Sequence, residues 1–262
     1  MAREIRLLST DFDGTLVAHA NDPVFDVNCM ERIRDLQKSG SVWAINTGRS
    51  VDLLESGLAD FSFPVRPDYI LTSERDVFRP ATNGGKWEPY GDWNNRSARA
   101  HSELFLTASP LLRDVAHFVA RHTKARLLYE GSAEPTGLIA ESEEEMSRIV
   151  RFIDESRGEH PRFHYQRNTV YLRFCHEDYH KGAALEELSR LLEIPAENIF
   201  AAGDQHNDIS MLDGRYAAMP ACPSNAIDEV KEVVTGAGGY VAGKECGAGI
   251  NEALSHFAGR GD

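Results

Sequence analysis

The stretch IRLLSTDFDGTL, residues 5–16, places a short apolar run directly before a polar cluster. Residues 5–9 have the length and composition of a buried strand, and Asp11-Phe12-Asp13-Gly14 follows it. A second apolar run, SVWAIN at 41–46, precedes Thr47-Gly48-Arg49. Both runs are followed by the apolar spacing of an amphipathic helix, and this alternation is typical of an α/β fold. The sequence therefore predicts a mostly parallel sheet covered by helices.

The alternating pattern is interrupted between residues 79 and 178. Residues 79–100 are rich in Gly, Pro and Asn, which indicates an irregular crossing or a hairpin. A helix over 111–119, strands at 125–130 and 136–141, a helix over 146–153 and strands at 163–168 and 169–174 then repeat a helix–strand–strand pattern. We therefore expect one α/β core made of residues 1–78 and 179–262, with an α+β module, residues 79–178, inserted into it.

The composition excludes several classes of function. The 262 residues carry 28 Lys and Arg against 41 Asp and Glu, a net charge of −13, and the basic residues are scattered. Such a chain repels the backbone of nucleic acids, so we expect no nucleic-acid partner, and any phosphate site needs a local cation. No apolar run approaches the roughly 18 residues of a membrane span, and the charged start MAREIR is unlike a signal peptide. The four cysteines form no CxxC pair, which favours a reduced, cytoplasmic chain, and nothing indicates an oligomeric state.

Two acidic clusters follow predicted strands, at the edge of the sheet where ligands bind in open α/β folds. Asp11 and Asp13 are two residues apart, so both carboxylates can reach one metal ion or one phosphate; the alternative is an ordinary turn. A calcium loop is excluded, because its glycine stands sixth and Gly14 is fourth here. Asp204 and Asp208, in GDQHND (203–208), offer oxygen ligands to a hard cation; the alternative is a capped helix start.

Two further motifs suit a phosphate group. Thr47 and Gly48 offer a hydroxyl and a backbone N–H just before a predicted helix, where a phosphate oxygen can bind; an ordinary strand–helix turn is the alternative. Lys181-Gly182 opens another predicted helix and is a weak signal when taken alone.

Together, DFDGTL, TGR, the isolated Lys181 and GDQHND resemble the haloacid dehalogenase superfamily of phosphohydrolases in their order and spacing. The insert lies between the second and third motifs, as in members with a C2-type cap, such as the Cof-type and sucrose-phosphatase-like sugar phosphatases. The resemblance covers nearly the whole chain and implies a Rossmann-like parallel-sheet core with an inserted α+β cap domain. It also implies Mg²⁺ and an aspartyl-phosphate intermediate.

The resemblance implies a role for each matching residue. Asp11 would be the nucleophile, and Asp13 would protonate the leaving alkoxide and then deprotonate the attacking water. Mg²⁺ would be held by Asp11, the main-chain carbonyl of Asp13 and Asp204, with Asp208 close behind. The phosphate oxygens would be bound by Thr47, the Gly48 N–H and Lys181, while Asn207 would steady Lys181 or the phosphate. The expected reaction is hydrolysis of a small phosphate monoester, a sugar phosphate, and the expected partner is a small phosphorylated metabolite.

One loop departs from the pattern of these relatives. Cof-type members usually carry an Asn-Gly pair after the third strand, whereas this chain has Thr72-Ser73-Glu74-Arg75. That loop often meets the substrate in the family, so the particular phosphate ester is left open.

The insert offers candidate residues for substrate recognition. Side chains alternate along a strand, so Val170, Leu172 and Phe174 form an apolar face and Thr169, Tyr171 and Arg173 a polar one. In a C2-type cap the polar face would lie over the catalytic cleft, so Tyr171 and Arg173 are candidate substrate contacts, with Arg167 on the neighbouring strand. The alternative for Arg173 is a surface ion pair.

Three other functions are weighed against hydrolysis. A phosphotransferase or phosphomutase would use the same aspartyl-phosphate intermediate. A zinc metallohydrolase could use His176, Glu177 and His180, which spell H-E-x-x-H. That motif needs both histidines on one helical turn, whereas here it joins a predicted strand to a helix starting near Lys181. A catalytically idle binding module is disfavoured because all four motifs are intact.

Overall fold

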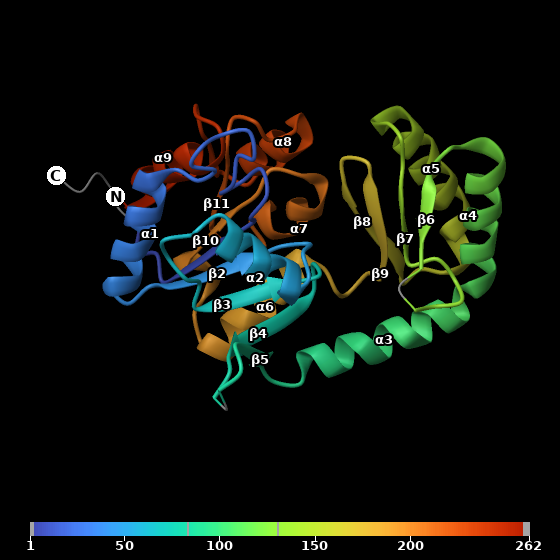
Figure 1. The fold of residues 1–262 in the computed structure, drawn as a ribbon, viewed down its shortest axis with the longest axis horizontal. Helices are drawn as coiled ribbons and strands as arrows, with labels where there is room; N and C mark the ends of the chain where they lie inside the picture. The colour runs from blue at the N-terminus through green and yellow to red at the C-terminus, as the bar shows by residue number, and fades with distance from the viewer. Residues whose placement is uncertain (1–2, 83, 130, 259–262) are drawn as a thin grey trace. The chain divides into compact units, whose positions relative to one another are not determined.

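A computed structural model describes residues 3–82, 84–129 and 131–258 (Figure 1). The chain divides into two compact units. The core unit comprises the chain up to Asn94 and from Lys181 onward, and the insert unit is Asn95–His180.

The core unit contains a sheet with the strand order β12-β11-β10-β1-β2-β3-β4-β5. Its strands are β1 (Leu7–Thr10), β2 (Val42–Asn46), β3 (Tyr69–Thr72), β4 (Asp76–Pro80), β5 (Trp87–Pro89), β10 (Ile199–Ala202), β11 (Met219–Cys222) and β12 (Tyr240–Val241). All neighbours from β12 to β3 pair in parallel, and β4 and β5 add an antiparallel hairpin at one edge. The predicted α/β fold with a mostly parallel sheet is confirmed.

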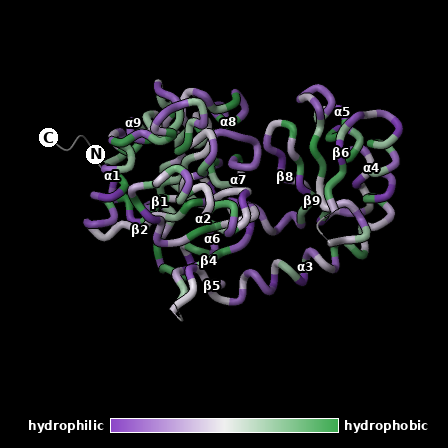
Figure 2. The backbone as a smooth tube through the Cα atoms, in the orientation of Figure 1, coloured by the Kyte–Doolittle hydropathy of each residue, from purple (hydrophilic) through white to green (hydrophobic). Residues whose placement is uncertain are grey.

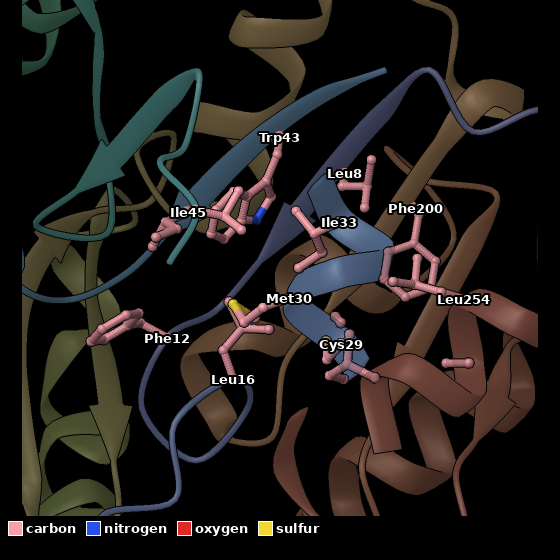
Figure 3. Packing of buried hydrophobic residues seen from close by; sticks show 14 of the residues in the cluster. Leu8, Phe12, Leu16, Cys29, Met30, Ile33, Trp43, Ile45, Phe200 and Leu254 are labelled. Carbon is pink, nitrogen blue, oxygen red and sulfur yellow. The ribbon is translucent and has the colours of Figure 1, made fainter. Parts of the chain in front are cut away.

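Helices cover both faces of this sheet. They are α1 (Val27–Lys38), α2 (Val51–Asp60), α6 (Lys181–Leu192), α7 (Ile209–Leu212), α8 (Asp228–Gly236) and α9 (Cys246–Ala258), with 3-10 turns η2 (Ala196–Asn198) and η3 (His206–Asp208). Successive strand side chains point to opposite faces, so Leu8 packs in one apolar cluster with α1, α2 and α9, and Leu7 in another with α6, α7 and α8. Figure 3 shows Met30 and Ile33 of α1 pointing toward Leu8 and Trp43 of the sheet. Each fully buried side chain of this kind stabilises the fold by about 1.5–3 kcal/mol.

The insert unit is an antiparallel sheet covered by helices. Its strand order is β6-β7-β9-β8. Its elements are α3 (Trp93–Thr107), which begins at the boundary between the units, α4 (Ser109–His122), β6 (Arg126–Leu128), β7 (Gly137–Ile139), α5 (Glu143–Ser156), η1 (Arg157–Glu159), β8 (Phe163–Asn168) and β9 (Tyr171–His176). Leu172 and Phe174 of β9 are buried against apolar residues of the three helices. Hydrophobic and hydrophilic segments alternate along α3 and α4 in Figure 2, as expected of helices that cover a sheet.

The structure differs from the sequence pattern at three places. Strands β4 and β5 pair with the core sheet, so the division between units falls after Asn94 and not after residue 78. The helix α3 begins at Trp93, inside a stretch whose Gly, Pro and Asn content had indicated an irregular segment. In the insert, β9 begins at Tyr171 and not at Thr169, because Thr169 has a left-handed backbone (φ 51°) in the hairpin turn.

Among the residues that the structure describes, no helix combines the length and the apolar character that crossing a membrane requires.

Candidate active site

Two aspartates meet where neighbouring parallel strands end. Asp11 directly follows β1, and Asp204 comes two residues after β10, the strand that pairs with β1. The backbone N–H of Asp11 donates to the carbonyl of Ala202 at 2.8 Å, which continues the pairing into the loop. Both carboxylates are buried, with 7% and 4% relative exposure. The sheet therefore brings together two acidic motifs that are far apart in the sequence.

Lys181 lies between two carboxylates. It is the first residue of α6 and is fully buried, and its Nζ donates to Asp11 Oδ1 and to Asp208 Oδ1, both at 2.6 Å. Burial alone would lower the pKa of Lys181, but the two carboxylates outweigh it and raise that pKa above its usual range. The backbone carbonyl of Lys181 also accepts from Asn46 Nδ2 at 3.0 Å, which fixes the start of the helix against β2. The site therefore holds a permanent buried cation.

Three carboxylates surround this one ammonium group. Oxygen atoms of Asp11, Asp204 and Asp208 lie within 4.8 Å of one another, and in the described part of the chain no other acidic, histidine or cysteine side chains form such a group. Burial raises the pKa of Asp11 well above its usual range; Lys181 opposes this shift, and Asp208 and Asp204 add to it. Burial and the Asp208 charge likewise raise the pKa of Asp204 to about 7. This excess of negative charge on oxygen ligands fits a hard divalent cation.

The surrounding loops hold the carboxylates in fixed positions. Thr15 Oγ1 donates to Asp204 Oδ1 at 2.7 Å, and the N–H groups of Asp204 and Gln205 both donate to Asp208 Oδ2 at 2.9 Å. Gly14 has a left-handed backbone (φ 80°), and a Cβ atom there would lie 2.5 Å from Asp204 Oδ2. A glycine is therefore required for the loop after β1 to approach Asp204.

Asp13 is held apart from this cluster by other partners. Its carboxylate accepts from Arg49 Nε at 2.7 Å and Nη2 at 2.6 Å, and it lies 2.7 Å from His19 Nε2. Burial would raise the pKa of Asp13, but the hydrogen bonds and charge of Arg49, with His19, lower it overall. Arg49 in turn lies over the Phe12 ring, with its CZ carbon 5.0 Å from the ring centroid. Asp13 is thus held as a carboxylate.

A second group of residues comes from three loops: Thr47 and Gly48 follow β2, Glu74 follows β3, and Asn207 lies in η3. Thr47 Oγ1 accepts from the N–H of Arg49 at 3.2 Å, which leaves the hydroxyl hydrogen to act as a donor. The buried Asn207, in η3, donates from Nδ2 to Glu74 Oε1 at 2.9 Å. A Cβ atom on Gly48 would lie 3.1 Å from that same Glu74 oxygen. The partner of Asn207 is therefore Glu74, whereas Lys181 Nζ is bonded to the two aspartates.

The candidate recognition residues of the insert fall on two faces. Tyr171 and Arg173 share one face of β9, where Arg173 Nε and Nη2 donate to the Tyr171 hydroxyl at 3.2 and 3.1 Å. Arg167 pairs with Leu172, so it shares the face of that buried residue. Its Nε donates to the carbonyl of Thr169 in the hairpin turn. Arg167, the candidate on the neighbouring strand, therefore lies on the opposite face of the insert sheet from Tyr171 and Arg173.

The residues of the H-E-x-x-H motif do not form a zinc site. His176 ends β9 and α6 begins only at Lys181, so His176 and His180 do not share a helical turn. The backbone N–H of His176 donates to His101 Nε2 at 3.2 Å, and His176 Nδ1 accepts from the N–H of Asp178. Neither histidine belongs to the metal-ligating group of the described residues.

Sequence reasoning missed four residues that shape the site. Thr15 and Arg49 belong to the motifs DFDGTL and TGR, so both could have been found from the sequence, although the motifs by themselves give neither of them a role. Glu74 stands in the loop that departs from the family pattern, and its burial was not visible from the sequence. Asn46 gave no signal, because it reads as the last residue of a strand.

The chain belongs to the haloacid dehalogenase-like hydrolase family, whose sequence model matches residues 114–254, more than half of the chain. The resemblance drawn from the four motifs is thereby confirmed.

Similar proteins are named as phosphatases. A phosphoglycolate phosphatase of Metallosphaera sedula is 25% identical over 231 residues, which cover 88% of this chain and 90% of that protein. A phosphoglycolate phosphatase of Picrophilus torridus is 30% identical over 86 residues, so this match spans only about a third of either protein. The sucrose-phosphatase of Synechocystis, solved with sucrose and phosphate, has a similar fold (TM-score 0.71, 18% identity, 97% of this chain and 98% of that one). The chain is therefore a member of a hydrolase family in which several similar proteins are named as phosphatases.

Proposed function

We propose that this enzyme hydrolyses a small phosphate monoester, a sugar phosphate, with Mg²⁺ and through an aspartyl-phosphate intermediate on Asp11. The proposal depends above all on one observation: a fully buried Lys181 bonded to both Asp11 and Asp208, beside a third carboxylate. The phosphoglycolate phosphatase names of relatives favour a small phosphate monoester as the substrate. The sucrose and phosphate bound to the Synechocystis enzyme favour a sugar phosphate within that class.

The carboxylate cluster fits Mg²⁺. Asp11, Asp204 and Asp208, with the main-chain carbonyl of Asp13, would hold the ion. Burial raises the pKa of Asp11 and of Asp204, and the charge of neighbouring carboxylates adds to both shifts, as expected of a cation-binding site. When bound, the ion supplies the positive charge that lets an anionic phosphate approach an anionic carboxylate.

Four groups of the chain would bind the phosphate oxygens. Lys181 would supply a charged donor, Thr47 its hydroxyl, and Gly48 a backbone N–H. The Asn207 amide has a second N–H beyond the one directed at Glu74. Donors placed where the transferring group carries its negative charge stabilise the transition state.

The covalent steps need only Asp11, Asp13 and water. An Asp11 carboxylate oxygen would form a bond to phosphorus while the bond to the ester oxygen breaks, and Asp13, after taking up a proton from solvent, would give that proton to the leaving alkoxide. Asp13, then ionised, would take a proton from a water molecule as that water attacks the phosphorus. Inorganic phosphate leaves, and the Asp11 carboxylate is restored. Asp13 accepts bonds from Arg49 and His19 in the structure, which is the ionised form suited to the second step.

The state of the cysteines bears on the location of the enzyme. All four cysteines are free thiols in the structure, and we infer a reducing, cytoplasmic location for a hydrolase of small metabolites.

Phosphate release from a panel of sugar phosphates and p-nitrophenyl phosphate tests the proposal. We expect release that requires Mg²⁺, stops reversibly with a chelator and is abolished in Asp11→Asn with the fold retained. Addition of a free sugar distinguishes hydrolysis from transfer, because a phosphotransferase would then form a new sugar phosphate. Turnover that persists in Asp11→Asn would exclude the covalent mechanism, and no release from any ester would overturn the function.

A further inference from the structure

Glu74 is a buried acid beside the proposed phosphate site, with no role in the steps above. It lies in the turn between β3 and β4 and has only 4% relative exposure. A buried carboxylate is costly unless hydrogen bonds compensate for lost hydration. Its place in the chain is also strained, because Ser73 and Glu74 both have left-handed backbones (φ 52° and 65°). The left-handed backbone and the burial together give the Glu74 side chain a fixed position in the turn.

The backbone of this turn is tied to the loop that follows β2. The N–H of Ser73 donates to the carbonyl of Arg49 at 2.9 Å, and the N–H of Glu74 donates to the carbonyl of Thr47 at 3.0 Å. Gly48 leaves room for the Glu74 carboxylate, since a Cβ there would lie 3.1 Å from Oε1. The turn thus places the Glu74 carboxylate against the Thr47-Gly48 loop.

The same carboxylate oxygen determines how the Asn207 amide is oriented. An ionised carboxylate only accepts hydrogen bonds, so the Nδ2 end of Asn207 must face Glu74, as it does at 2.9 Å. The other end, Oδ1, is buried and has no hydrogen-bond donor among the described residues. If the amide were free to rotate, Oδ1 could turn toward the phosphate and repel it, because both are acceptors.

We propose that Glu74 is a positioning residue: by accepting one N–H of the Asn207 amide, it leaves the second N–H of Nδ2 to face the phosphate site and fixes the amide against the Thr47-Gly48 loop. This inference rests on the proposed function. A hydrogen bond from a neutral donor to a charged acceptor is among the stronger ones in proteins. It therefore suits a side chain that must keep one orientation while phosphate enters and leaves.

Three substitutions at position 74 separate this role from folding. Glu74→Ala removes the acceptor, and we expect kcat/KM to fall about 10-fold to 100-fold. Glu74→Gln keeps an oxygen that can accept from Asn207, so we expect a smaller loss of about threefold to tenfold. Glu74→Gly also removes the acceptor, so it should lower kcat/KM as much as Glu74→Ala does. Because glycine adopts a left-handed backbone without strain, the melting temperature of Glu74→Gly should be equal to or above that of Glu74→Ala.

A matched control is Glu187, which is also buried (6% relative exposure) but lies on α6 and pairs with Arg190 at 3.0 Å. Glu187→Ala should leave kcat and KM close to those of the wild type, whatever it does to the melting temperature. If Glu187→Ala lowered kcat/KM as much as Glu74→Ala, the effect at position 74 would be a general consequence of removing a buried acid.

A double-mutant cycle between Glu74→Ala and Asn207→Ala is the decisive test. If Glu74 acts through Asn207, the double variant should lose no more than Asn207→Ala alone. The cycle is measured twice, by kcat/KM with p-nitrophenyl phosphate and by the affinity for inorganic phosphate in the presence of Mg²⁺. Additive losses in both readouts would overturn the inference and leave the proposed function intact. A wild-type enzyme that binds phosphate but hydrolyses no ester would overturn the function, while the affinity cycle would still decide the role of Glu74.

Discussion

Lys181 is the residue on which the site depends most, because its buried ammonium group donates to two buried carboxylates. We expect Lys181→Ala to lower kcat by about 10²-fold or more, the effect of losing one donor to the transition state. The same change removes the ion-pair partner of Asp11 and Asp208, so the free energy of unfolding should fall by about 3–5 kcal/mol without metal. Turnover of p-nitrophenyl phosphate and urea unfolding measure the two effects.

His176→Ala and His180→Ala are the comparison for Lys181→Ala, since neither histidine joins the metal-ligating group. Both should retain most of the activity. A large loss in the histidine variants together with bound zinc and a mild effect of Lys181→Ala would mean that the H-E-x-x-H motif carries the chemistry.

The raised pKa of Asp204 predicts how the free energy of unfolding depends on pH. Its usual pKa of 3.8 is raised to about 7 in the folded chain, so the folded state binds this proton more tightly than the unfolded state. The free energy of unfolding of the metal-free protein should therefore fall as pH rises from about 4 to about 7. Mg²⁺ binds the ionised form, so it should raise the melting temperature more at about pH 8 than at about pH 5.5. Thermal unfolding at the two pH values, with and without Mg²⁺, measures this.

Asp204→Asn removes one of the two aspartates with a raised pKa, so it should reduce that pH dependence, and Asp11 should account for the rest. An equal gain in melting temperature from Mg²⁺ at both pH values would show that the ion does not bind at this cluster.

At the scale of elements, Arg49 links the loop after β1 to the loop after β2 through its two bonds to Asp13. Arg49→Ala removes the group that lowers the pKa of Asp13, so burial acts with less opposition and that pKa rises. We expect the limb of the pH–rate profile that reports Asp13 to move to higher pH, with a fall in kcat at neutral pH. Arg66→Ala is a fitting control, because Arg66 is exposed and pairs with Glu55 away from Asp13. If the pH–rate profile of Arg49→Ala matched that of the wild type, the measured limb would not report the ionisation of Asp13.

The strands and their ends are the part of the fold that the sequence predicted best. Apolar runs before Asp11, Thr47 and Asp204 indicated which residues would meet at one edge of the sheet, because parallel strands end together there. The contacts of Glu74 could not be predicted, since they depend on a turn between two strands and on the backbone angles within it. The face of Arg167 depends on the register between β8 and β9, which the hairpin turn sets.

At the scale of the whole molecule, the insert gives the enzyme a second surface with its own polar face. Tyr171 and Arg173 share a face of the insert sheet, while Leu172 and Phe174 are buried on the face that packs against helices. We propose that Arg173 and Tyr171 take part in recognising the substrate. A guanidinium held by a tyrosine hydroxyl is a donor-rich group that suits the hydroxyls of a sugar.

Arg173→Ala should therefore lower kcat/KM for the best sugar phosphate of the panel far more than for p-nitrophenyl phosphate, whose flat ring offers few partners for such donors. The loss of one charged hydrogen-bond donor predicts a change of about tenfold or more in the ratio of the two values. Arg167 is the matched comparison, because it has the same side chain on the opposite face of the same sheet, bonded to its own hairpin turn. Arg167→Ala should leave that ratio as it is in the wild type. Equal losses for both substrates in Arg173→Ala would mean that this residue acts on the chemical step or on stability, and would exclude it from the surface that distinguishes one phosphate ester from another.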